Sequence, residues 1–192
     1  MAVHITKICS AAFYQLHNIR RIRKYLLMDT AATLNYSFVS SRIDYCNSLL
    51  YGALKRHIDK LQRVQNAAAS LVVMQGKFCH ITPVLYQLHC LPVSFCFNFK
   101  ILLLTLKGIL VLAPSYINDL FKINPFNSIY RLRSNDGILL SHPSFKTLTT
   151  LSERAFVASA PKLWNDLPLE IRMAKSFKKI LKTHLFSKVF HS

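Results

Sequence analysis

The chain has 192 residues, of which 25 are Lys or Arg and 8 are Asp or Glu, so its formal net charge is +17. Hydrophobic residues make up 52% of the sequence, which is enough to form a core and excludes a disordered basic tail. The positive charge disfavours small neutral ligands and favours polyanions, meaning nucleic acid or an anionic membrane surface.

Helical periodicity dominates the first part of the chain. Apolar residues recur at steps of three or four from Ile5 to Leu26, and again from Ile58 to Val72, where Gly76 is the expected stop. Between these two helices, Asp29 is expected to cap a helix that runs to Gly52.

Shorter helices are expected further along. Thr82-Pro83 predicts the cap and first turn of a helix that ends near His89. Another helix is expected over Ser94–Val111, and Pro114 is expected to open a short one. The longest apolar run, 101–113, is interrupted by Lys107 and is shorter than the roughly 20 residues of a membrane span, so it predicts a buried helix.

From residue 124 to 150 the sequence is rich in turn residues. Asn135-Asp136-Gly137 could close a hairpin. After it, Pro161 is expected in the first turn of a short helix that ends at Pro168 and buries Trp164, the only tryptophan. The last helix is expected to start at Ser176 and to bury Phe177, Ile180, Leu181, Leu185 and Val189.

These elements predict a mainly α fold, a helical bundle-like assembly with a small irregular or β-hairpin insert around 124–150. We divide it into a helical region, 1–123, and a C-terminal region, 124–192, with the insert and the terminal helix. The odd number of cysteines and the start "MAVHITKICSAAF", which lacks a secretory apolar segment, favour reduced thiols and an intracellular location, nucleus or cytoplasm, without a membrane partner.

Acidic residues that could support catalysis are scattered. Asp44, in "SSRIDYCNSLLYG", has no other acidic residue near it in the sequence. Nucleotidyl transfer needs two or three carboxylates to hold its metal ions, so Asp44 alone is not a catalytic site. We expect Asp44 to contact an Arg or a backbone group, and Tyr45 and Cys46 to pack against other residues. Asp166 and Glu170 are separated by Pro168, which breaks the helix that would align them. The sequence therefore predicts no catalytic residue and no cofactor.

A possible metal site lies in "FCHITPVLYQLHCLP", where Cys79-His80 and His89-Cys90 provide four potential ligands. Zinc sites usually space paired ligands by two to four residues, and adjacent ligands point apart. We therefore expect no zinc site here.

Basic residues carry the strongest functional signal. They gather on three predicted helices that have few compensating acids, and we interpret them as contacts to phosphates, which give affinity without reading sequence. A solvated helix face is the alternative for any single run. The candidate nucleic-acid-binding residues are Arg20, Arg21, Arg23, Lys24, Arg56, Lys60, Arg63, Lys178, Lys179 and Lys182.

Several motifs follow one another in an order that resembles the C-terminal end of one family. The motifs are "SSRIDYCNSLLYG", "LQRVQNAAASLV", "HITPVLYQLHCLPV", "FKILLLTLKGILVLAPSYI", "RLRSNDGILL" and "ERAFVASAPKLWNDLPLEIR". They resemble the reverse transcriptases of non-LTR retrotransposons of the jockey and chicken-repeat type. "HITKICSAAFYQLHNIRRIRKYL" is similar to the thumb segment before them, so the resemblance implies that 1–123 is a thumb-like region.

The resemblance implies that the family's catalytic aspartates, in an "ADD" core, and its endonuclease lie upstream of the part found here. It thus implies a basic helical tail near template RNA and target DNA. The sequence departs from the family at Cys90, where Trp is usual, at Val111, where Gly is usual, and at Ser70 and Cys96, where Arg is usual.

We therefore expect a non-catalytic fragment of an RNA-directed DNA polymerase, with at most non-specific binding to the RNA or DNA backbone. The alternative is a small helical module that binds a protein partner through exposed apolar surface. A decaying copy without function is the third possibility.

Overall fold

The computed structural model describes residues 2–45, 47–76, 79–120, 139–141 and 155–191. These residues are mainly helical, which confirms the expected fold class. The chain divides into two compact units, Met1–Cys96 and Phe97–Ser192. The division predicted between 123 and 124 falls among residues that are not described and stays a prediction, as does the hairpin, of which only 139–141 are described.

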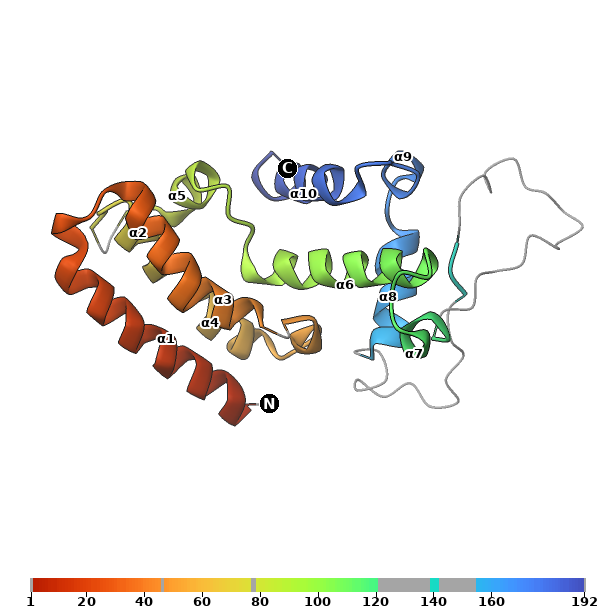
Figure 1. The fold of residues 1–192 in the computed structure, drawn as a ribbon, viewed down its shortest axis with the longest axis horizontal. Coiled ribbons are helices and arrows are strands. Elements are labelled where there is room, and N and C mark those ends of the chain that lie inside the picture. The colour runs from red at the N-terminus through yellow and green to blue at the C-terminus, as the bar shows by residue number, and fades with distance from the viewer. Residues whose placement is uncertain (1, 46, 77–78, 121–138, 142–154, 192) are drawn as a thin grey trace, which may run out of the picture. The chain divides into compact units, whose positions relative to one another are not determined.

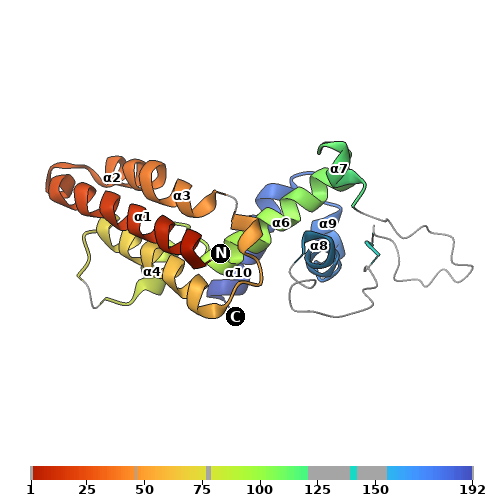
Figure 2. The same cartoon turned by 90° about the horizontal axis from the view of Figure 1, so that it is seen from below.

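The first unit is built around two long helices, α1 (Ala2–Ile22) and α4 (Lys55–Val72), whose C-terminal ends lie together (Figure 1). Helix α2 (Met28–Asn35) and the short α3 (Ser41–Asp44) return along α1, as Figure 2 shows. The predicted apolar stripes form the core of this unit. Its fully buried side chains include Ile5, Ala12, Leu61 and Val64.

The single helix predicted from Asp29 to Gly52 is wrong in detail. Leu27, not Asp29, is the N-cap residue of α2, and a π-helical turn, Tyr36–Ser40, separates α2 from α3. Hydroxyl groups bond back along this stretch: Ser37 Oγ donates to the Thr33 carbonyl at 2.9 Å and Ser41 Oγ to the Ser37 carbonyl at 2.6 Å. Such bonds compete with the regular helical pattern and favour a local irregularity.

The expected stop of α4 at Gly76 is also wrong. The helix ends at Val72, and Met74, two residues before Gly76, is the left-handed residue that follows it, with a φ of 56°. The Gln75 N–H donates to the Ser70 carbonyl at 3.0 Å, and the Met74 N–H donates to the Leu71 carbonyl at 3.4 Å. These two bonds form a Schellman motif, which normally uses glycine at the left-handed position.

Helix α5 (Ile81–Gln87) begins one residue before Thr82, so the predicted cap is displaced, with His80 as the N-cap residue. Its end near His89 is confirmed. His89 has a φ of 50°, and the Cys90 N–H donates to the Leu85 carbonyl at 2.9 Å, so α5 ends in the same way as α4.

Helix α6 (Val93–Ile109) begins in the first unit and continues through the second. Phe97, Ile101 and Leu102 are buried, in agreement with a buried rather than a lipid-facing helix. Among the described residues, no helix is long and apolar enough to cross a membrane. After α6, Pro114 precedes the short α7 (Ser115–Asn118), as predicted.

The rest of the second unit consists of α8 (Phe156–Asn165), α9 (Leu169–Arg172) and α10 (Phe177–Phe190) (Figure 1). The expected burial of Trp164 is confirmed, because its side chain is 1% exposed and its ring centroid lies 5.6 Å from that of Phe177. Pro161 lies inside α8 rather than in its first turn, because the helix starts at Phe156.

Helix α10 buries a stripe at steps of four, Phe177, Leu181 and Leu185. Ile180 was expected in this stripe but is exposed, and Val189 is only half-buried. A step of four keeps one narrow row against the core, so residues one position before that row turn toward solvent.

Candidate nucleic-acid interface

Of the Arg and Lys residues predicted to contact nucleic acid, all but one have exposed side chains. All except Arg23 are exposed: Arg20, Arg21, Lys24, Arg56, Lys60, Arg63, Lys178, Lys179 and Lys182.

Arg23 differs from the prediction because it is buried, at 8% exposed, inside the first unit. Its Nε donates to the Leu71 carbonyl at 3.0 Å and its Nη2 donates to the Val72 carbonyl. Its Nη1 donates to the Leu26 carbonyl at 2.8 Å. The guanidinium therefore satisfies carbonyls at the C-terminal end of α4, where the helix dipole also favours a positive charge. Its donors face protein carbonyls rather than an incoming phosphate.

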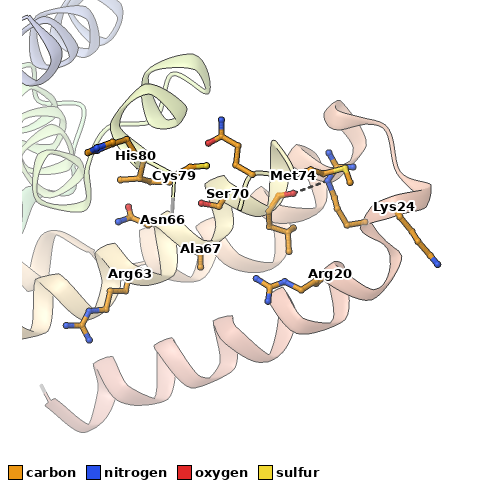
Figure 3. A pocket seen from close by; sticks show the side chains of 13 residues that line it. Arg20, Lys24, Arg63, Asn66, Ala67, Ser70, Met74, Cys79 and His80 are labelled. Carbon is orange, nitrogen blue, oxygen red and sulfur yellow. Dashed lines mark hydrogen bonds between the residues drawn. The ribbon is translucent and has the colours of Figure 1, made fainter. Parts of the chain in front are cut away.

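A pocket of about 1030 Å³ lies where the C-terminal ends of α1 and α4 meet the segment before α5. Arg20 and Lys24 line it from the α1 end and Arg63 lines it from α4. Figure 3 shows Arg20 and Arg63 on facing helices, whereas the Lys24 side chain points outward from the rim. No acidic residue is among the described residues that line this pocket, so its positive potential is not compensated locally.

Neutral polar side chains complete the pocket, and we did not predict them from the sequence. Asn66 and Ser70 lie on α4, at three and seven residues after Arg63, and Gln75 follows the helix end. The helical spacing of three and seven from Arg63 was the available signal, since such residues share one face. Amide and hydroxyl groups of this kind commonly bond to phosphate oxygens.

The residues considered for zinc do not meet in one place. Cys79 and His80 line the pocket (Figure 3), whereas His89 lies at the end of α5. Among the described residues, no group of three or more His, Cys, Asp or Glu side chains could hold a metal ion.

Asp44 accepts a hydrogen bond from Asn47 Nδ2 at 3.3 Å. Tyr45, which was expected to pack, is exposed. Cys46 lies outside the described residues.

The other end of α4 carries a buried histidine beside two of the predicted cations. Burial, together with the charges of Arg56 and Lys60, lowers the pKa of His57. Burial also raises the pKa of the Cys9 thiol on α1, an effect that Lys60 partly offsets. The positive charge near α4 therefore acts on groups of both long helices, and it disfavours further protonation there.

No protein-family model matches this sequence, and neither the curated proteins nor the solved structures provide a match.

Proposed function

We propose that this chain is a non-catalytic part of a retrotransposon-type reverse transcriptase that binds the phosphate backbone of RNA or DNA without sequence preference. The observation that carries the proposal is the pocket between Arg20, Lys24 and Arg63, which no described acidic residue lines. The positive side chains around this hollow repel one another, and a polyanion relieves that repulsion. The resemblance of the sequence motifs supports the assignment to the enzyme family.

Ser70 offers a gain-of-function test of the same pocket. The resemblance leads us to expect Arg at position 70. Ser70 lines the pocket on the same face of α4 as Arg63. An arginine here adds a further cation and a planar set of donors suited to phosphate. We expect Ser70→Arg to raise the affinity for RNA.

The main test is fluorescence anisotropy with labelled RNA and duplex DNA of unrelated sequences, in about 50 and 200 mM salt. We expect similar affinities for all sequences and a steep loss with salt. The variant Arg20→Gln/Lys24→Gln/Arg63→Gln should reduce the slope of log affinity against log salt by roughly 2–3, since each lost phosphate contact removes about 0.7–0.9. The control Lys55→Gln/Lys107→Gln/Lys162→Gln removes three exposed cations outside the pocket and should leave that slope nearly unchanged.

The proposal fails if the protein does not bind at low salt, if its affinity ignores salt, or if the control changes the slope as much as the pocket variant does. The last outcome would assign the binding to net charge rather than to this pocket.

A protein-interaction module is the second candidate, favoured by the turn between α1 and α2. Tyr25 is 76% exposed and Leu27 is 79% exposed, and Met28 beside them is exposed as well. Adjacent exposed apolar side chains of this size are typical of protein contacts. Under this candidate, binding to a partner survives high salt and is lost in Leu27→Ser/Met28→Ser, two residues that do not line the pocket, while RNA affinity is unchanged.

A further inference from the structure

A second pocket lies wholly within the second unit, between α6 and the first turns of α10, which runs alongside α6 in Figures 1 and 2. Its volume is about 480 Å³, within the range of about 300–1000 Å³ that small-ligand pockets have. The apolar residues that line the pocket are Phe99 and Leu106 on α6 and Phe177 on α10. Phe99 and Leu106 are seven residues apart on α6, so they share one face, and both are half-buried.

Apart from Ser176, the rest of the lining is basic. Lys175, Lys178, Lys179 and Lys182 all line the pocket, and all four are exposed. No acidic residue is found among its described lining residues. The first turn of α10 contains no acid, and Ser176 makes no side-chain cap bond there, so the N–H groups of this turn add to the positive potential.

An anion with a flat apolar part fits this arrangement. The lysines attract phosphates, and an aromatic ring beside them provides a face on which a base can stack. A membrane surface fits less well, because membrane binding needs apolar side chains that project beyond the basic ones. Here the apolar residues are half-buried or buried and line a hollow, so the ligand has to enter the pocket. In duplex DNA or RNA the bases are already stacked and cannot do so without being flipped out.

Resting on the proposed function, we propose that this pocket binds single-stranded nucleic acid, with a base against Phe99 and the neighbouring phosphates on the α10 lysines. This site distinguishes single strands from duplexes, whereas the pocket near Arg20 and Arg63 contacts phosphates of either. The base contact gives a role to an aromatic side chain that lines a pocket together with four lysines.

The test compares three probes in an anisotropy assay with the full chain. They are oligo(dT) of about 20 nucleotides, longer than the ~4–16 nucleotides that one single-strand-binding fold covers, an abasic strand of equal length, and a duplex. We expect wild-type protein to bind oligo(dT) more tightly than the abasic strand. Phe99→Leu should weaken oligo(dT) binding roughly tenfold, because stacking on one aromatic ring contributes about 1–3 kcal/mol. Its affinity for the abasic strand and the duplex should stay unchanged, which also shows that the variant folds.

The matched control is Phe186→Leu, which removes a half-buried aromatic ring of α10 that packs on Phe190 and does not line the pocket. It should leave all three affinities unchanged. Lys178→Gln/Lys179→Gln/Lys182→Gln should weaken the binding of every probe and reduce its salt dependence.

The inference is overturned if wild-type protein binds oligo(dT) and the abasic strand with equal affinity. It is also overturned if Phe99→Leu leaves the affinity for both strands unchanged. Binding to phosphates, and with it the proposed function, then still stands. Absence of binding to all probes overturns both. Vesicles of phosphatidylcholine and phosphatidylserine provide the last arm: a loss of vesicle binding in Phe99→Leu with unchanged oligo(dT) affinity assigns the pocket to lipid and overturns the inference.

Discussion

Arg23 lies in a basic run with Arg20, Arg21 and Lys24, yet it has a different physical role from its neighbours. In the sequence all four are cations near the end of one helix, and charge alone gives no means of separating them. Its role follows from its buried position beside the end of α4, where it donates to backbone carbonyls that have no partner within the helix. The Leu71 carbonyl, which accepts from Arg23 Nε, is 48 residues away in the sequence, so the sequence alone could not predict this contact.

Arg23→Ala should destabilise the first unit by about 2–4 kcal/mol, because buried carbonyls lose a charged donor. Arg23→Lys should recover only part of this loss, since an ammonium cannot reproduce the planar set of donors that reaches three carbonyls. The measurement is the free energy of unfolding in urea. Arg21→Ala, an exposed neighbour, serves as the control and should change stability by less than about 0.5 kcal/mol. Equal effects of the two alanine variants would contradict the structural role of Arg23.

Val111 is a second residue whose conformation is unusual for its type. Its φ is 56°, and the Leu112 N–H donates to the Lys107 carbonyl at 2.8 Å, so α6 ends in a Schellman motif with a β-branched residue at the left-handed position. The resemblance expects glycine at this position, for which a positive φ gives a physical reason.

Val111→Gly should stabilise the protein by about 0.5–1 kcal/mol. Relief of the left-handed strain exceeds the extra backbone entropy of glycine in the unfolded chain, and little packing is lost because Val111 is exposed. The midpoint of thermal unfolding measures this change. Leu112→Gly, the exposed neighbour with no positive φ, should lower the midpoint instead. A lower midpoint for Val111→Gly would show that the strain is not stored there.

At the scale of elements, long periodic helices were predictable and their ends were not. The stripes of α1 and α4 were right because many buried apolar residues at regular steps specify one face. The ends depend on single hydrogen bonds and on residues that accept a left-handed conformation without being glycine, such as Met74 and Val111. The π-helical turn between α2 and α3 likewise depends on local bonding, which apolar spacing does not record.

The packing of α8 against α10 gives a prediction at this scale. Trp164 is 1% exposed and touches Phe177, and next to it Asn165 bonds to both backbone groups of Leu140, at 3.1 and 2.9 Å. Trp164→Ala should therefore destabilise the second unit by about 3–5 kcal/mol, through lost burial and the cavity left behind.

Trp164→Phe keeps most of the apolar volume and should cost much less. Urea unfolding of both variants measures the difference. Because the indole is buried, RNA affinity should be the same in Trp164→Phe as in the wild type. A stable Trp164→Ala variant with reduced RNA affinity would instead assign the indole to base stacking.

At the scale of the whole molecule, both units are basic. The first has only three acidic residues, Asp29, Asp44 and Asp59, and the second has five. The proposal of a polyanionic partner therefore rests on composition and on the exposed basic runs. Composition could not locate the pockets, because each joins side chains from helices that are distant in the sequence, as Arg20 and Arg63 or Phe99 and Lys178 are.

The same distribution of acids leads to the last prediction, that this chain alone does not extend a primer. Nucleotidyl transfer needs converging carboxylates to hold divalent ions. Asp29, Asp44 and Asp59 lie on three different helices, α2, α3 and α4, and exposed cations such as Arg56 and Arg63 flank the last of them on α4. These positive side chains repel a magnesium ion, so the ion gains little from a single carboxylate there.

Primer extension on an RNA template with magnesium or manganese measures this directly, with the protein at a concentration that saturates template binding. We expect no extended product from the wild type or from Asp44→Ala/Asp59→Ala. Template binding should be retained in both, which separates absent chemistry from absent substrate. Extension by the wild type that disappears in the double variant would mean that the chain assembles a metal site from these aspartates, and it would overturn the proposal of a non-catalytic backbone-binding part.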